Sequence, residues 1–108
     1  MFARILQFGL KVEMKKDFID VFKNQVLPIL KKQVGFVEVL PFFPEKVADQ
    51  TTYNVSLWVT KADAERFEKE TYPKVFAILQ PFLTTPVTVK LFNLETTLCE
   101  HLVDSLAA

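Results

Sequence analysis

The order in which two kinds of hydrophobic periodicity follow one another constrains the fold of this chain more than any other feature. A period of two indicates a strand, and a spacing of three and four residues indicates an amphipathic helix. Six segments show one of these patterns or a continuous apolar run. In chain order they are the strand-like 2–13, the helix-like 15–33, the strand-like 36–42 and 52–59, the helix-like 60–80, and the strand-like 87–96. The sequence therefore predicts the order β-α-β-β-α-β.

This order is that of the split βαβ, or ferredoxin-like, motif. It predicts an α+β fold in which a four-stranded antiparallel sheet carries its helices on one face. Two helices leave the other face open, and the strand over residues 36–42 is apolar on both of its sides. Because an uncovered apolar face is typical of an interaction surface, we expect a homodimer whose sheets pack face to face.

Local signals refine the helices. Pro28 lies inside the first helical pattern, has no N–H to donate to Asn24 and crowds that carbonyl, so we expect a kink or a break between these two residues. Thr60 and Asp63 have the spacing of a capping box, which predicts a helix start. Pro73 suits the first turn of a further helix.

Composition excludes several classes of function. The 13 Lys and Arg residues balance 13 Asp and Glu residues, which disfavours nucleic acid as a partner. The only glycines, Gly9 and Gly35, are too far apart for a phosphate-binding loop or a dinucleotide fingerprint. One Cys and one His exclude a zinc finger, and no disulfide can form within the chain. No apolar run approaches 18 residues and no targeting segment is visible, so we expect no membrane span and a cytoplasmic location.

Three stretches carry a family resemblance. They are Val26-Leu27-Pro28 leading to Gly35-Phe36, Val55-Ser56-Leu57-Trp58 followed by Thr60-Lys61-Ala62-Asp63-Ala64, and Thr71-Tyr72-Pro73-Lys74-Val75. In these stretches the chain resembles the dimeric α/β-barrel proteins of the antibiotic biosynthesis monooxygenase-like family. The resemblance extends over nearly the whole chain, so we expect a single domain over residues 1–97 and a C-terminal tail over residues 98–108.

The resemblance implies a set of site residues. Anthrone-type oxygenases of the family place an Asn and a Trp four residues apart on the third strand, facing a cavity, and Asn54 and Trp58 have that spacing. These two are the implied catalytic residues. Ser56 lies between them on the same face, Tyr72 is expected in the cavity wall, and Gln7 stands where some members carry an amide. We expect these three to bind substrate.

The resemblance does not extend to the haem-degrading members. Those members need a His on the second helix as the iron ligand, and Glu68 stands at that position, in a charge run that we interpret as a solvated helix face. The only His, His101, lies in the tail close to Cys99. We therefore expect no haem, metal or flavin, and we assign no role to His101, Cys99 or the tail.

Together these observations predict a cofactor-independent monooxygenase, or a related small-molecule enzyme, acting on a hydrophobic and enolisable substrate. A deprotonated phenol or anthrone can itself reduce O₂, and Asn54 and Trp58 would donate hydrogen bonds to the developing oxyanion. The pattern identifies no base. The alternative is a non-catalytic ligand-binding or structural dimer of the same fold. A cavity of a few hundred Å³ walled by Asn54 and Trp58 would favour the enzyme, and a tightly packed Trp58 the alternative.

Overall fold

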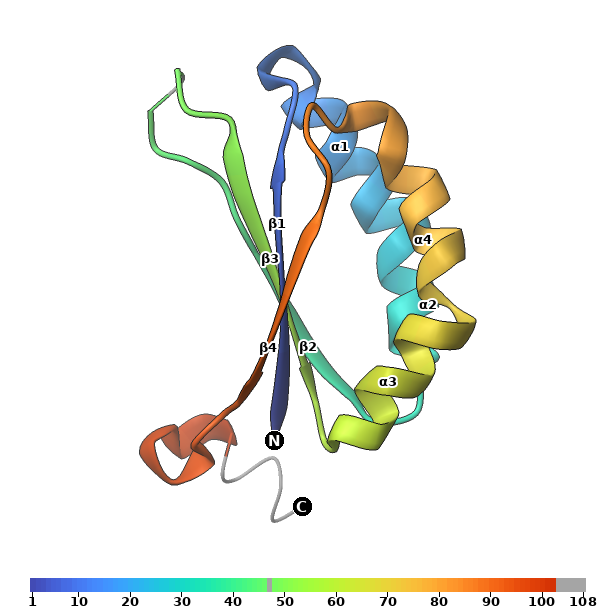
Figure 1. Cartoon of the computed structure of the whole chain (residues 1–108), viewed down its shortest axis with the longest axis vertical. Coiled ribbons are helices and arrows are strands. Elements are labelled where there is room, and N and C mark those ends of the chain that lie inside the picture. Colours follow the sequence, from blue (N-terminus) through green and yellow to red (C-terminus); the bar gives the residue numbers. More distant parts are fainter. Residues whose placement is uncertain (47, 103–108) are drawn as a thin grey trace.

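A single antiparallel sheet organises the computed structural model, which describes residues 1–46 and 48–102. The strands lie in the order β2-β3-β1-β4, and all the long helices lie along one face of the sheet (Figure 1). The strands are β1 (Phe2–Gly9), β2 (Phe36–Phe42), β3 (Thr51–Trp58) and β4 (Thr88–Asn93). The predicted α+β ferredoxin-like fold is confirmed. No helix within these described residues has the length and apolarity to span a membrane.

The first helical segment is continuous but irregular. It consists of α1 (Lys15–Val21), a π-helical turn over Phe22–Val26 and α2 (Leu27–Lys31). The Leu27 N–H donates to the Phe22 carbonyl, five residues back, just before Pro28. Because Pro28 cannot donate to Asn24, the widened turn keeps the helix going past a residue that would otherwise break it. The expected irregularity is therefore present, as a π turn rather than a break.

The second helical segment begins and divides as its sequence predicts. The helix α3 (Lys61–Glu70) starts at Thr60, whose hydroxyl accepts a hydrogen bond from the Asp63 N–H at 3.1 Å. The helix α4 (Tyr72–Leu79) follows with a proline in its first turn, and a 3₁₀ turn over Gln80–Phe82 ends the segment.

The first strand is shorter than predicted, since β1 ends at Gly9 and not near residue 13. The loop before β4 comes so close that Gly9 donates its N–H to the Thr85 hydroxyl at 2.7 Å and accepts from the Thr84 N–H at 2.9 Å. A Cβ at Gly9 would collide with Thr84, so this close approach requires a glycine. The chain then turns through a 3₁₀ segment, Val12–Met14, into α1.

The last strand is also shorter than predicted, and β4 ends at Asn93. A 3₁₀ turn over Thr96–Leu98 follows, and Leu102 is buried at one end of the open sheet face against Ala3 and Leu57. Of the tail predicted over residues 98–108, the part beyond residue 102 lies outside the described residues.

The two faces of the sheet differ in what covers them. The helix-facing side chains of β1, β3 and the helices form the main core; among them are Phe2, Leu6, Phe8, Phe18, Phe22, Val26, Trp58 and Phe67. The open face is apolar, as the sequence predicts, and several of its large side chains are exposed. They are Leu40, Phe42, Tyr53 and Phe92.

Candidate functional site

Strand register places the predicted polar residues on the helix-facing side of the sheet. Asn54, Ser56 and Trp58 alternate along β3 and are all buried. Ser56 pairs with Arg4 of the neighbouring strand β1, and Asn54 pairs with Leu6, which belongs to the core. The three residues therefore share one face, as the alternation predicts.

Trp58 is packed on all sides. Its indole lies 5.6 Å from the ring of Phe36 and 4.9 Å from that of Phe67, between centroids, and it is fully buried. The indole N–H donates to the Ser56 hydroxyl at 3.0 Å, and this hydroxyl donates to the Arg4 carbonyl at 3.4 Å. Trp58 thus packs the sheet against Phe67 of α3. Its N–H already has an acceptor.

Asn54 differs from its two neighbours. Its side chain is buried, and within the described part of the chain its Oδ1 receives no hydrogen bond. A buried amide oxygen without a donor costs about 1–3 kcal/mol, and such groups are few in native structures. Asn54 therefore presents an unused acceptor on the helix-facing side of the sheet.

Arg4 supplies the complementary group. Its side chain is 2% exposed, and its Nε and Nη2 have no hydrogen-bond acceptor among the residues described. The guanidinium lies over the ring of Tyr72, with Cζ 4.2 Å from the ring centroid, and 5.6 Å from that of Phe67. One carboxylate oxygen of Glu68 lies 3.7 Å from Nη2, which makes an ion pair too long for a hydrogen bond. A buried cation thus retains donors that can take a further acceptor.

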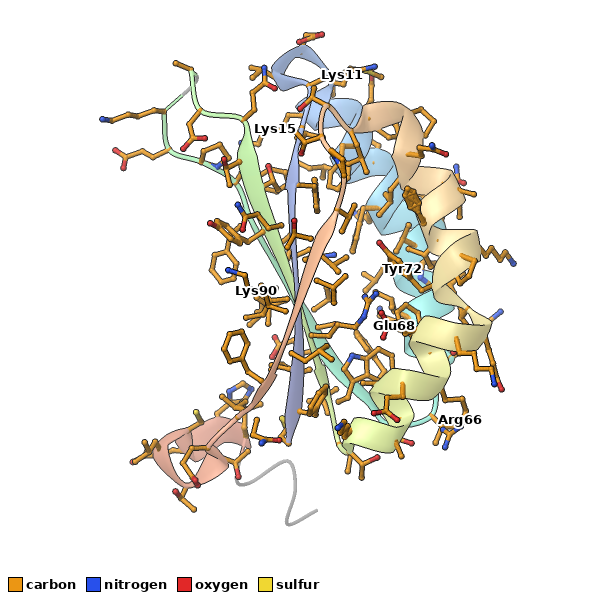
Figure 2. The ribbon with its side chains drawn as sticks, in the orientation of Figure 1. Lys11, Lys15, Arg66, Glu68, Tyr72 and Lys90 are labelled. Atoms are coloured by element: carbon orange, nitrogen blue, oxygen red, sulfur yellow. The ribbon has the colours of Figure 1, made fainter. Side chains whose placement is uncertain are left out.

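Glu68 and Tyr72 come from the helices and reach toward the sheet (Figure 2). Glu68 is 42% exposed, as expected of a solvated helix face, but its carboxylate also pairs with the buried Arg4, which the sequence interpretation did not include. Burial raises the pKa of the Tyr72 hydroxyl, and the nearby Arg4 opposes part of that rise. The Tyr72 phenol is therefore protonated at neutral pH.

The family resemblance does not identify Arg4 or Glu68 as site residues. Arg4 is the one charged residue at the otherwise apolar positions of the first strand, and this break in the pattern is the signal that marks it. Nothing in the sequence marks Glu68, because its partner lies 64 positions away along the chain.

Gln7 is not brought together with the other predicted site residues. It pairs with Tyr53 and Thr88, whose side chains lie on the open face, and successive side chains of β1 alternate between faces. Gln7 is thus on the opposite side of the sheet from Asn54.

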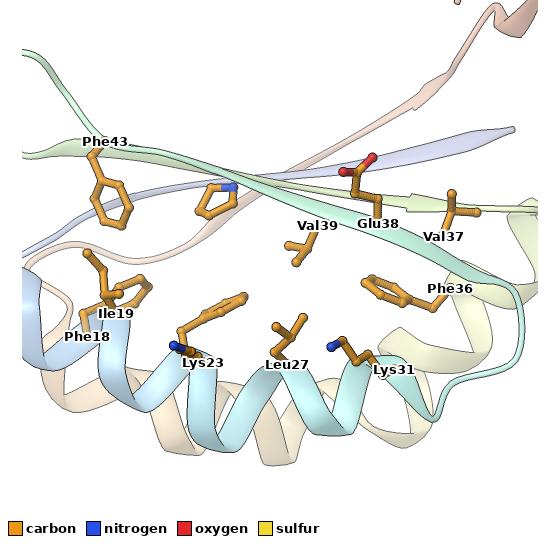
Figure 3. A pocket seen from close by; sticks show the side chains of 12 residues that line it. Phe18, Ile19, Lys23, Leu27, Lys31, Phe36, Val37, Glu38, Val39 and Phe43 are labelled. Carbon is orange, nitrogen blue, oxygen red and sulfur yellow. The ribbon is translucent and has the colours of Figure 1, made fainter. Parts of the chain in front are cut away.

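An apolar pocket of about 450 Å³ lies between the α1–α2 segment and β2 (Figure 3). Its sheet wall includes Phe36, Val39 and Pro41, which pair across strands with Trp58, Ser56 and Asn54 respectively. The pocket is therefore separated from the polar residues of β3 by one strand spacing, about 4.8 Å. Neither Asn54 nor Trp58 lines this pocket, which differs from the expected cavity because the side chains of β2 stand between.

Metal ligands do not gather in the described part of the chain: over residues 1–46 and 48–102, no three His, Cys, Asp or Glu side chains form a group that could hold a metal ion.

Comparison with known proteins places this geometry in a recognised fold. No family model matches the sequence, and no curated protein matches it. Among solved structures, SnoaB from Streptomyces nogalater, a cofactor-independent oxygenase, is 19% identical with a TM-score of 0.70, covering 91% of this chain and 96% of its own. The ActVA-Orf6 monooxygenase of Streptomyces coelicolor, solved with Nanaomycin D, is 12% identical with a TM-score of 0.70, covering 87% of each chain. Identities this low show a shared fold. The chain has the α+β fold of the antibiotic biosynthesis monooxygenase-like proteins that its sequence resembles.

Proposed function

We propose that this protein is a cofactor-independent monooxygenase, or a closely related enzyme, that acts on a hydrophobic and enolisable small molecule. The observation that carries the proposal is the pair of unused, complementary groups on neighbouring strands: the Arg4 donors and the Asn54 acceptor.

In this proposal the two groups serve one substrate atom. Arg4 pairs with Ser56, so Arg4 and Asn54 are diagonal neighbours on one face of the β1–β3 ladder. Such neighbours lie about 7–8 Å apart at their Cα atoms, within reach of a long side chain. An enol or phenol hydroxyl between them donates to the Asn54 Oδ1. Once deprotonated, the same oxygen accepts from the Arg4 guanidinium.

A buried cation favours the deprotonated substrate. Charge stabilisation by a preorganised donor is strongest where water is excluded, and Arg4 is almost fully buried. Tyr72 and Phe67 lie against the guanidinium, and its Nε and Nη2, which have no acceptor among the described residues, would donate to the oxyanion. Ser56 acts through Trp58 and the Arg4 backbone, to which it is hydrogen-bonded, and so holds the local geometry.

Glu68 is the base in this proposal. Its carboxylate lies beside Arg4 and is 42% exposed, so it can take a proton from the substrate and release it to solvent. The enolate then gives an electron to O₂, and the substrate radical and superoxide combine to a peroxide anion. A proton from solvent or from Glu68 converts it to the hydroperoxide, and loss of water leaves a carbonyl. The overall change, CH₂ plus O₂ giving C=O plus H₂O, balances without a further reductant.

A homodimer is part of the same proposal. The exposed apolar side chains Leu40, Phe42, Tyr53 and Phe92 lie on the open face of the sheet, which a second copy of the chain would cover.

One observation favours a second candidate, a non-catalytic ligand-binding dimer. The Trp58 indole is fully packed and its N–H is already used by Ser56, so Trp58 in this arrangement has no donor for an oxyanion.

Oxygen consumption separates the two candidates. Anthrone is incubated with the protein in an oxygen electrode, with serum albumin as the protein control. The enzyme predicts O₂ uptake above the albumin rate, and a fall of about 100-fold in turnover for Glu68→Gln. Lys69→Gln, the exposed neighbour on the same helix, is the matched control and should keep the wild-type rate. Uptake equal to that with albumin would favour the binding protein.

A further inference from the structure

The helix side of the apolar pocket carries a regular stripe of cations. Along the α1–α2 segment, lysines alternate with apolar residues every four positions: Lys15, Ile19, Lys23, Leu27 and Lys31. All but the first line the pocket. The ammonium of Lys15 lies 4.8 Å from the ring centroid of Phe43, which lines one end of the same pocket. The edge of the pocket is therefore both apolar and positively charged.

Lys23 and Lys31 flank Leu27 on the helix side of the pocket (Figure 3). Both side chains are exposed, and neither forms an ion pair within the described residues. They are eight positions apart, which is about 12 Å along a helix. Because the ammonium groups end flexible four-carbon stems, both can reach a single anionic group above Leu27.

The acidic residue in the pocket lining does not neutralise this charge. Glu38 belongs to β2, but it pairs with Leu57 on the open side of the sheet. Its carboxylate points away from the helices in Figure 3, whereas Val39 and Phe36 point toward them. The interior of the pocket is thus apolar, and the unbalanced charge on the helix side is positive.

We propose that this pocket binds an amphipathic organic anion, with an apolar, ring-bearing body inside and a carboxylate or similar acidic group held between Lys23 and Lys31. The volume of about 450 Å³ suits a small molecule of this kind. The aromatic walls, Phe18, Phe22 and Phe36, match rings in the body of the ligand. This anion site is separate from the proposed catalytic groups, because neither Arg4 nor Asn54 lines the pocket.

A matched pair of fluorescent probes tests the charge. 1-Anilinonaphthalene-8-sulfonate carries an acidic group, and N-phenyl-1-naphthylamine is the same molecule without it. Both are titrated against the wild type, the double variant Lys23→Gln/Lys31→Gln and the control Lys69→Gln/Lys74→Gln, which removes two exposed charges from α3 and α4. The first double variant should raise the Kd of the sulfonate by roughly 3- to 30-fold. It should change the Kd of the naphthylamine by less than about twofold, and the control variant should change neither.

Two further measurements locate the probe. Raising NaCl from 20 to 300 mM should weaken only the sulfonate, because salt screens exposed charges within about 10 Å. Val39→Phe, which fills the sheet wall of the pocket, should weaken both probes if they bind there, and circular dichroism reports whether this variant folds. Equal effects of the two lysine pairs, or sulfonate binding insensitive to Lys23→Gln/Lys31→Gln, would overturn the proposal. So would binding that weakens as protein concentration rises, since a second copy would then occupy the groove.

These outcomes are independent of turnover. Lysine-dependent binding of the sulfonate without O₂ uptake would support the anion site and contradict the oxygenase. Uptake with anthrone but no lysine-dependent binding would support the oxygenase and contradict the anion site.

Discussion

The Arg4 guanidinium stacks on the Tyr72 ring, with Cζ 4.2 Å from the ring centroid. This contact joins β1 to α4 across the core and shields one face of the cation from water. A desolvated cation–π contact contributes about 2 kcal/mol. The desolvation cost of the buried cation opposes this gain, since its Nε and Nη2 have no acceptor among the described residues. Within the described part of the chain, Nε and Nη2 of Arg4 therefore remain available to a further acceptor.

Replacement of Arg4 by Met tests whether the guanidinium serves stability or chemistry. Because Nε and Nη2 have no acceptor among the described residues, an apolar side chain of similar length should keep or raise the free energy of unfolding. Turnover of anthrone should fall by about 100-fold or more. Thermal denaturation and O₂ uptake measure the two effects. A Tm lowered by more than about 5 °C with unchanged turnover would make Arg4 a structural residue.

Substitutions of Asn54 and Ser56 should have opposite effects on the free energy of unfolding, although the two residues are two positions apart on the same strand. Asn54→Leu removes an acceptor that no described group uses, so the free energy of unfolding should stay constant or rise. Ser56→Ala removes the acceptor of the Trp58 N–H and should lower it by about 1–3 kcal/mol. Urea denaturation of both variants measures the difference.

The turnover of anthrone by Asn54→Leu completes this comparison. Asn54→Leu should reduce turnover of anthrone, because the enol hydroxyl then has no acceptor at this position. If Asn54→Leu instead unfolds at clearly lower urea concentration and keeps its turnover, Asn54 supports the fold and the non-catalytic dimer becomes the better hypothesis.

The sequence predicts the fold well because each element carries its own local signal. The alternation around Ser56, the cap at Thr60 and the proline at position 28 all act through neighbours close in the chain, and the structure confirms each of them. Strand ends were predicted less well, since Gly9 leaves the sheet through contacts with Thr84 and Thr85 that only the folded chain provides.

The candidate site was predicted only in part for the same reason. The spacing of Asn54 and Trp58 is local and identifies their shared face. The ion pair of Arg4 with Glu68 depends on how α3 packs on β1, which no spacing encodes. The amide of Gln7 matched a family pattern, but the alternation of side chains along β1 places Gln7 on the opposite side of the sheet from Asn54.

High pH should test the burial of Tyr72. Burial raises the pKa of this phenol above its ordinary value, so the folded state holds the proton more tightly than the unfolded state. The resulting stabilisation is fully present below pH about 10, the unfolded pKa, and is lost as the pH rises through the folded pKa. The free energy of unfolding of the wild type should therefore fall more steeply above pH 10 than that of Tyr72→Phe. Parallel curves for the two proteins would contradict a raised pKa.

The same raised pKa excludes the Tyr72 phenolate as the base at neutral pH. Turnover by Tyr72→Phe should accordingly keep the shape of the wild-type pH profile below pH 9. If the wild-type rate rises with pH and Tyr72→Phe loses this rise, the base is Tyr72 and not Glu68.

The open face of the sheet should hold two chains together. Leu102 covers one end of this face, over Ala3 and Leu57, while Phe42 and Phe92 remain about half exposed. Side chains of this size on one sheet face are typical of an interface. Sedimentation equilibrium at micromolar concentration should give twice the chain mass of 12.5 kDa for the wild type and 12.5 kDa for Phe42→Lys/Phe92→Lys, whose charges would lie unpaired in the interface. Val34→Lys changes a more exposed apolar residue outside the sheet and should remain dimeric. A wild-type monomer would contradict the dimer, and a monomeric Val34→Lys variant would place the interface elsewhere.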